Sequence, residues 1–167
     1  MISGEYSTFQ SVIGTIFVVT QNQKISEIHI GKEDFLQSSN SKLLTYNPEN
    51  VLLIETIRQL EEYFLGERRS FTLPLEQKGT AFQMSVWSEL DNIPFGQTKS
   101  YQDIASAIGN SKAVRAIGQA NKANKLPIII PCHRVIGKNL SLTGYAGKRT
   151  DIKEKLLLLE GAAFKKI

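Results

Sequence analysis

The sequence predicts an α+β fold in which a small sheet-plus-helix domain precedes a mostly helical domain. Residues 1–79 contain strand-like runs rich in β-branched and aromatic residues, whereas helix caps and helical spacing of apolar residues dominate the remainder. The net charge changes sign at the same point, from −3 over residues 1–79 to +7 over residues 80–167. We therefore expect two domains, residues 1–78 and residues 79–167.

The composition is that of an ordinary globular protein, with 41% hydrophobic and 22% charged residues among 167. The longest apolar runs, residues 128–130 and 156–159, fall far short of the ~20 residues that span a membrane. No basic segment followed by an apolar core opens the chain, so we expect no signal peptide. The single cysteine, Cys132, excludes an intramolecular disulfide and a multi-cysteine zinc site. We therefore expect a cytoplasmic protein with no metal and no membrane partner.

Strand signals come first along the chain. Residues 12–20 are rich in β-branched and aromatic side chains, and residues 25–30 follow as their hairpin partner across a short turn. Residues 51–65 place apolar side chains at helical spacing and are closed by Gly66. Residues 67–79 contain proline and glycine, and we expect a strand there followed by a linker.

Helix caps mark the second half. Thr80 and Gln83 form a capping box, in which each side chain bonds a backbone N–H of the other end of the turn. Ser100 can cap a helix over residues 101–108, and Ser111 can cap the next helix. Two short helices joined by a glycine-containing turn match the helix-turn-helix pattern, although many helix pairs that do not bind DNA share it.

The last segments surround the cysteine. Residues 127–131 form an apolar, strand-like run bracketed by prolines, and Cys132 follows directly. Thr150 can cap a final helix that ends before Gly161. Of the two histidines in the chain, His29 lies in a predicted strand without a cluster of partners, so we expect it to be structural or at the surface.

Cys132 is the first candidate for chemistry. A lone cysteine usually packs as a small buried hydrophobic residue. Here His133 and Arg134 follow it, and positive neighbours lower a thiol pKa and favour the nucleophilic thiolate. If this segment is extended, adjacent side chains point in opposite directions. His133 then reaches the thiol only through a water molecule or a bent backbone.

Arg115 is the second candidate, because it lies in the second short helix among small residues, Ala113, Ala116, Gly118, Ala120 and Ala123. A helix whose surface consists of such small side chains can approach the minor groove, which is only about 6 Å wide. A solvent-facing arginine is the alternative. Residues 98–149 hold nine Lys and Arg but one acidic residue, Asp103. This excess of positive charge is typical of a polyanion partner and equally of a solvated basic face, and charge alone does not separate the two.

The segment Pro131-Cys132-His133-Arg134-Val135-Ile136 resembles the active-site signature of the 6-O-alkylguanine-DNA alkyltransferases, also called methylated-DNA–protein-cysteine methyltransferases. The likeness covers nearly all of residues 80–167 and is looser before them. Its other segments, in order, are Phe82-Gln83 with Val86-Trp87, Ile93-Pro94 with Gly96, Thr98 and Ser100-Tyr101, Arg115 to Gly118 with Ala120, Asn124, Gly144 to Gly147, and Leu157 to Gly161. The resemblance implies a ribonuclease-H-like N-terminal domain and a C-terminal DNA-binding and alkyl-transfer domain with a winged-helix-like helix-turn-helix.

The resemblance also implies a reaction. The Cys132 thiolate attacks the alkyl carbon of a flipped-out 6-O-alkylguanine, and of 4-O-alkylthymine as well, once and irreversibly. His133 takes the thiol proton through water, Glu160 holds the imidazole, and Tyr101 bonds the purine so that guanine leaves as a neutral base. No cofactor or metal takes part.

For DNA, the resemblance implies a monomer that binds duplexes carrying alkylated bases through the minor groove. Arg115 fills the gap left by the flipped nucleotide, and Asn124 ties the helix-turn-helix to the active-site segment. The DNA contacts also include Ala116, Gly118 and Gln119, and the base pocket includes Val135, Tyr145 and Ala146. Two departures concern the pocket rim: Ala146 replaces a serine of some members, and Lys148 stands where many have glycine.

Three alternatives compete with this interpretation. A damage-binding homologue that does not repair bases would lack the cysteine, so Cys132 argues against it. A helix-turn-helix regulator would need a polar recognition helix for the major groove, and this helix is mostly Ala and Gly. A cysteine hydrolase would need turnover and a direct contact between Cys132 and His133, which the sequence does not favour.

Overall fold

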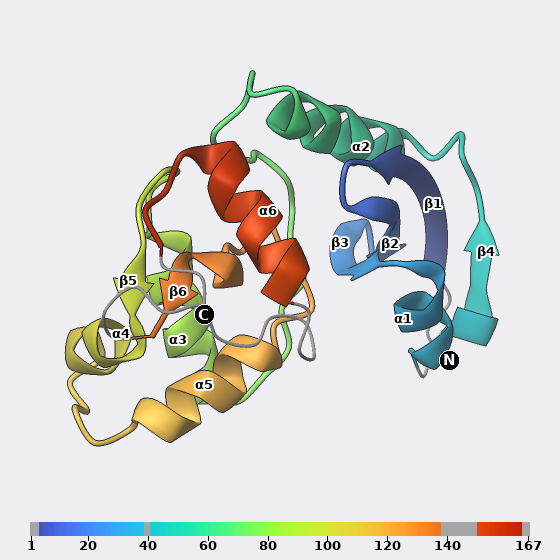
Figure 1. Ribbon diagram of the computed structural model, residues 1–167. Helices are drawn as coiled ribbons and strands as arrows, with labels where there is room; N and C mark the ends of the chain where they lie inside the picture. The colour runs from blue at the N-terminus through green and yellow to red at the C-terminus, as the bar shows by residue number, and fades with distance from the viewer. Residues whose placement is uncertain (1–3, 39–40, 138–149, 165–167) are drawn as a thin grey trace. The chain divides into compact units, whose positions relative to one another are not determined.

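The computed structural model describes residues 4–38, 41–137 and 150–164, and the chain divides into two compact units, Met1–Gln77 and Lys78–Ile167. Their contents, a sheet with helices and a mostly helical assembly, confirm the predicted α+β class (Figure 1). Among the described residues, no helix has the length and apolar character to cross a bilayer.

The first unit is built on a four-stranded sheet in the order β3-β2-β1-β4 (Figure 1). Strands β1 to β3 form an antiparallel meander, and β4 pairs in parallel with β1. The strands are β1 (Gly4–Ser11), β2 (Gly14–Gln21), β3 (Lys24–Ile30) and β4 (Leu44–Tyr46). The predicted hairpin over residues 12–20 and 25–30 is present as β2 and β3, whereas β1 and β4 were not predicted.

Helices cover this sheet and explain why residues 16–19, in the middle of β2, are all apolar. The helices are α1 (Lys32–Gln37) and α2 (Val51–Phe64), with a short 3-10 turn, η1 (Ser41–Leu43), between them. Phe17 and Val19 of β2 cluster with Phe35 of α1. Ile16 and Val18 alternate with them and are also fully buried, because α2 packs on the sheet as well. The helix predicted over residues 51–65 is confirmed, and Gly66 ends it with a φ of 77°.

His29 has two carboxylate partners that the sequence did not reveal. Its Nδ1 lies 2.9 Å from Asp34 Oδ2, and its Nε2 lies 3.0 Å from Glu27 Oε1. Burial alone lowers the pKa of this imidazole, but the two carboxylates outweigh burial and raise the pKa to about 9. The expectation of a histidine without a partner cluster is therefore wrong.

The strand expected within residues 67–79 is also wrong. Only Leu75 makes a bridge, to Ile25, with backbone hydrogen bonds of 2.8 Å from Ile25 N to Pro74 O and from Glu76 N to Ile25 O. Pro74 has no N–H, so a ladder cannot continue through it.

The second unit contains helices α3 (Ala81–Asp91), α4 (Tyr101–Ala107), α5 (Val114–Lys122) and α6 (Thr150–Glu160), the 3-10 turn η2 (Cys132–Arg134), and a short parallel pair, β5 (Lys99–Ser100) and β6 (Val135–Ile136). The capping box of Thr80 and Gln83 is confirmed. Ser100 also caps α4, and Asp103 completes a second box there.

Two expectations in this unit are wrong. Ser111 does not cap α5, whose first flanking residue is Ala113 without a side-chain cap. Residues 127–131 form a buried turn instead of a strand, with Ile128 at a φ of 75° and a hydrogen bond of 2.9 Å from Ile130 N to Leu126 O. The two prolines that bracket this run lack the N–H groups that a strand ladder needs. Helix α6 is described from Thr150 onward, so its cap lies outside the described residues.

Candidate active site

Cys132 opens the tight turn η2 and is only 5% exposed. Its N–H donates to Ile130 O at 2.7 Å, and its own carbonyl accepts from Val135 N. The backbone here is therefore bent, which replaces the extended geometry considered from the sequence. In a 3-10 turn successive side chains lie about 120° apart, so Cys132 and His133 do not point in opposite directions.

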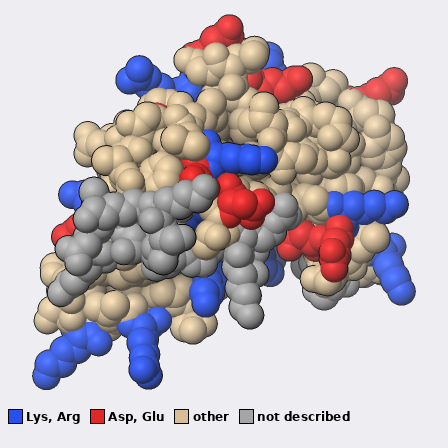
Figure 2. All heavy atoms as spheres, in the orientation of Figure 1, with Lys and Arg blue, Asp and Glu red and all other residues tan. Residues whose placement is uncertain are grey.

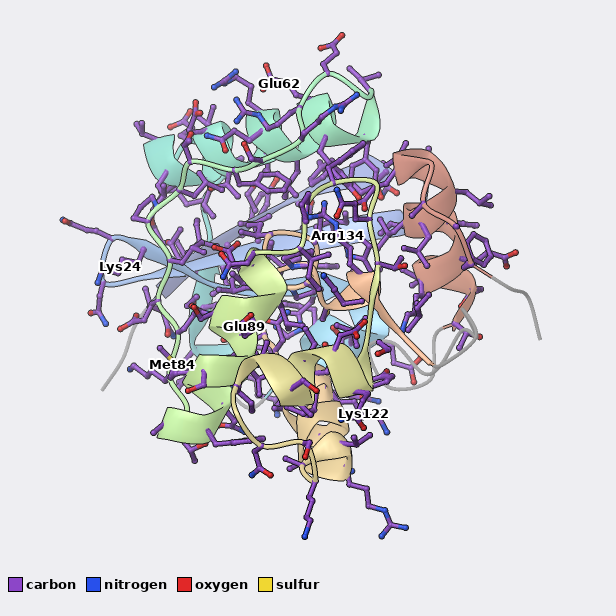
Figure 3. The ribbon with its side chains drawn as sticks, turned by 90° about the vertical axis from the view of Figure 1, so that its left-hand side faces the viewer. Lys24, Glu62, Met84, Glu89, Lys122 and Arg134 are labelled. Carbon is purple, nitrogen blue, oxygen red and sulfur yellow. The ribbon has the colours of Figure 1, made fainter. Side chains whose placement is uncertain are left out.

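A buried carboxylate, Glu160, holds both residues that follow the cysteine. Glu160 Oε2 lies 2.7 Å from His133 Nε2, and Arg134 donates to Oε1 from Nε at 2.8 Å and to Oε2 from Nη2 at 3.0 Å. The Nη1 group of Arg134 donates to Ile93 O at 2.6 Å. Arg134 therefore lies inside the unit (Figure 3) and is not part of a DNA-binding surface.

Electrostatics set the protonation of this group. Burial raises the pKa of the Glu160 carboxyl, but hydrogen bonds and charge from His133 and Arg134 outweigh burial and lower the pKa to about 2. Burial lowers the pKa of His133, so its imidazole is neutral at neutral pH. An ionised Glu160 accepts the Nε2 proton of His133. The lone pair of the ring then lies on Nδ1, which can accept a proton.

Lys153, which the sequence analysis did not select, is a second buried charge near the thiol. Its side chain is fully buried, and its Nζ donates to Val135 O. Burial lowers the pKa of Lys153 to about 8, and the charge of Cys132 raises it. The same attraction favours the Cys132 thiolate. Its position between Ile152 and Leu156, on the buried side of α6, is the only sequence signal that pointed to it.

Three side chains fix the end of α5 to its surroundings. Trp87 Nε1 donates to Ala120 O at 2.8 Å. Asn124 donates from Nδ2 to Ile130 O at 2.9 Å, so it bridges the helix-turn-helix and the segment before the cysteine. Asn121, which the sequence analysis missed, donates from Nδ2 to Cys132 O at 3.3 Å. Its spacing of four from the buried Ile117 places it on the inner face of α5.

The outer face of α5 carries basic residues among small side chains. Arg115, Ala116 and Gln119 are exposed and Gly118 is partly exposed. Lys and Arg side chains project from the region of α4 and α5 in Figure 2, and Figure 3 shows Lys122 at the end of α5. The exposed basic residues of residues 98–137 are Lys99, Lys112, Arg115, Lys122 and Lys125.

Tyr101 and Val135 come together through the short parallel pair. Lys99 pairs with Val135 and Ser100 with Ile136, so Tyr101, the next residue, begins α4 beside the turn that carries the cysteine. Tyr101 is half-buried and Val135 is fully buried. The predicted pocket residues Tyr145 and Ala146 lie outside the described residues. Within the described ranges, no three His, Cys, Asp or Glu side chains gather where they could hold a metal ion.

A buried cysteine followed by a neutral histidine, next to a helix-turn-helix with a basic outer face, fits a DNA-binding protein with group-transfer chemistry. Two family descriptions match the chain in sequence. The ribonuclease-like domain of 6-O-methylguanine DNA methyltransferase matches residues 5–77, and the DNA-binding domain of the same enzyme matches residues 81–162. The chain belongs to the 6-O-methylguanine DNA methyltransferase family.

Individual relatives agree over nearly the whole length. The constitutive methylated-DNA–protein-cysteine methyltransferase of Bacillus subtilis is 48% identical over 160 residues, which cover 96% of this chain and 97% of that protein. The corresponding Methanosarcina acetivorans protein is 44% identical over 94% of this chain and 98% of its own length. Mycobacterium tuberculosis OGT in complex with DNA has a TM-score of 0.84 at 38% identity, covering 94% of this chain and 92% of that chain.

Loss of the Glu160 charge should destabilise the protein strongly. We expect Glu160→Gln to lower the free energy of unfolding by about 3–5 kcal/mol at pH 7, because Arg134 is left buried without its counterion. The Glu160 pKa is lower in the folded state than its ordinary value of 4.5. Its charge therefore stabilises the fold above that value, and the difference between variant and wild type should shrink as the pH falls towards 2.

Denaturant unfolding of both proteins at several pH values measures this. Glu89→Gln, on the partly exposed side of α3, is the control and should change stability by no more than about 0.5 kcal/mol. An equal loss in the two variants would contradict the assignment.

Loss of the Lys153 charge should make the thiol less acidic. We expect Lys153→Met to raise the Cys132 pKa and so to lower the thiolate fraction at neutral pH, because the attraction between the two charges is lost. Because Cys132 is the only cysteine, the rate of its alkylation by iodoacetamide against pH reports this directly. Lys155→Met, exposed on the same helix, should leave the profile in place. Coincident profiles for wild type and Lys153→Met would remove Lys153 from the site.

Proposed function

We propose that this chain repairs DNA by moving the alkyl group of 6-O-alkylguanine to Cys132. The thiolate Sγ attacks the alkyl carbon in line, the S–C bond forms, the C–O6 bond breaks, and its electron pair leaves with guanine. The observation that carries this proposal is the buried group of Cys132, His133 and Glu160 beside the helix-turn-helix. The names of the relatives support it, since they describe methyl transfer from methylated DNA to a protein cysteine.

Protons move through the residues already described. Neutral His133, with Nε2–H on Glu160, accepts the thiol proton at Nδ1 through a bridging water. Tyr101, beside the turn that carries Cys132, gives its phenol proton to the purine as the C–O6 bond breaks, so guanine leaves as a neutral base. The proton that His133 took from the thiol balances the one that Tyr101 has given up. We assign the base pocket to Val135, Tyr145 and Ala146, of which the last two lie outside the described residues. A thioether does not release its alkyl group under mild conditions, so each molecule acts once.

The alkylated base must leave the duplex before the Cys132 thiolate can reach it. The small residues on the outer face of α5 suit close approach to the minor groove, with Ala116, Gly118 and Gln119 against the backbone. Arg115, exposed on that face, fills the vacated stack, and the surrounding lysines bind phosphates. A DNA complex of the Mycobacterium tuberculosis relative supports this partner. Residues 79–167 then form the DNA-binding and alkyl-transfer domain of a cytoplasmic monomer, which also accepts 4-O-alkylthymine.

Single turnover is the direct test. Incubation with an excess of methylated duplex should add one methyl group, about 14 Da by intact mass, to Cys132 and to no other residue, and repair should stop at one equivalent. Cys132→Ser should bind the same DNA and stay unmodified. Product that accumulates beyond one equivalent would contradict the mechanism.

The insertion of Arg115 predicts a difference between substrates. We expect Arg115→Ala to slow repair in duplex DNA by roughly 10- to 1000-fold, the equivalent of a few kcal/mol of stack disruption. The same variant should react almost normally with free O6-benzylguanine, which needs no flipping.

Lys122→Ala is the matched control, because it removes one exposed positive charge from the same helix. It should weaken DNA binding modestly in a salt-dependent way and leave the repair step intact. Duplex repair by Arg115→Ala at the wild-type rate would remove Arg115 from the mechanism, and equal slowing on the free base would point to a damaged pocket.

A further inference from the structure

The helix that carries Arg115 also touches the peptide of the nucleophile. Asn121 lies on the inner face of α5, is 4% exposed, and donates from Nδ2 to Cys132 O at 3.3 Å. Val135 N bonds the same carbonyl within η2. The side-chain bond to Cys132 is therefore a tertiary contact made by the helix that faces DNA.

The orientation of the Asn121 amide follows from its partner. A carbonyl oxygen accepts and cannot donate, so the amide nitrogen must face Cys132 O, and Oδ1 must point away from it. This Oδ1 is buried and has no hydrogen-bond partner among the described residues. A buried acceptor of this kind requires a donor, and an ordered water with several polar partners is the usual solution.

Two neighbouring side chains already hold the end of α5 in place without Asn121. Trp87 already fixes the last turn of α5 through Ala120 O, and Asn124 fixes the following turn through Ile130 O. Neither of these bonds reaches the cysteine itself. Asn121 alone among the three contacts the residue whose sulfur reacts.

We propose that Asn121 is a positioning residue for alkyl transfer: its Nδ2 orients the Cys132 peptide, and its Oδ1 accepts from an ordered water beside that residue. The proposal rests on the proposed function. It assigns α5 two tasks, with Arg115 on the outer face acting on DNA and Asn121 on the inner face acting on the nucleophile. A small displacement of a nucleophile is enough to slow a reaction about 100-fold, which is the size of effect that such a contact controls.

The test uses Asn121→Leu, which keeps the branched shape of the side chain and removes both its donor and its acceptor. The readout is the inactivation of the full chain by free O6-benzylguanine, followed by intact mass. We expect the maximal inactivation rate to fall by about 10- to 100-fold and the half-saturating concentration to change by less than about threefold. Affinity for undamaged duplex DNA should stay within about twofold of wild type.

Trp87→Phe is the control, because it removes the other buried side-chain hydrogen bond to the end of α5 without touching Cys132. It should lower the melting temperature at least as much as Asn121→Leu does, yet keep the inactivation rate within about threefold. If Asn121→Leu does not fold, Asn121→Ser serves with the same readouts, because its hydroxyl is too short to reach Cys132 O.

The outcomes distinguish a failure of the proposed function from a failure of the role of Asn121. No alkyl transfer by the wild-type chain would overturn the proposed function itself. Normal transfer by the wild type together with a wild-type rate for Asn121→Leu would overturn only the role of Asn121. Equal slowing in Asn121→Leu and Trp87→Phe would also overturn it, because both would then report general loosening of α5.

Discussion

The buried carboxylate of Glu160 is the interaction on which the catalytic turn depends. It lies at the end of α6 and joins His133 and Arg134, while Arg134 continues to Ile93 O after the end of α3. Burying such a charge is costly, and it is compensated here by two bonds from a guanidinium and one from an imidazole. The backbone at the end of α6 is also closely approached, because a Cβ on Gly96, which has a φ of 86°, would meet the main-chain oxygen of Glu160 at 3.3 Å.

This network also determines the chemistry of the thiol. Glu160 fixes the proton of His133 on Nε2, and burial keeps the ring neutral. The Nδ1 atom can therefore accept a proton. Lys153 adds a positive charge from the same helix as Glu160. In the proposed mechanism, Lys153 favours the Cys132 thiolate and Glu160 orients the His133 base. These two residues lie seven positions apart on one face of α6.

Local patterns predicted much of the fold. The capping box at Thr80, the cap at Ser100 and the hairpin of β2 and β3 depend on neighbours close in sequence, so the sequence could predict them. Strand β4 could not, because its three residues form a strand only through pairing with β1. The apolar run around Ile128 misled for the opposite reason, since burial in a turn gives the same composition as burial in a strand.

The candidate site likewise contains residues that the sequence predicted and residues that only tertiary contacts revealed. The motif around Cys132 and the contact between Glu160 and His133 followed from the resemblance. The charge count over residues 98–149 included Arg134, which is buried against Glu160 and adds nothing to an exposed basic face. Lys153 and Asn121 were missed because a single polar residue on a helix is normally solvated. Only tertiary packing shows that both face the cysteine turn.

The protonation state of His133 shows whether Glu160 holds this imidazole as a neutral base. The chain has two histidines with opposite expectations, so ¹⁵N NMR of the imidazoles between pH 5.5 and 8 contains its own control. We expect His133 to be neutral at pH 7 with its proton on Nε2, whereas His29, whose pKa is raised to about 9 by Asp34 and Glu27, should be fully charged. A charged His133, or a proton on Nδ1 at pH 7, would contradict the account.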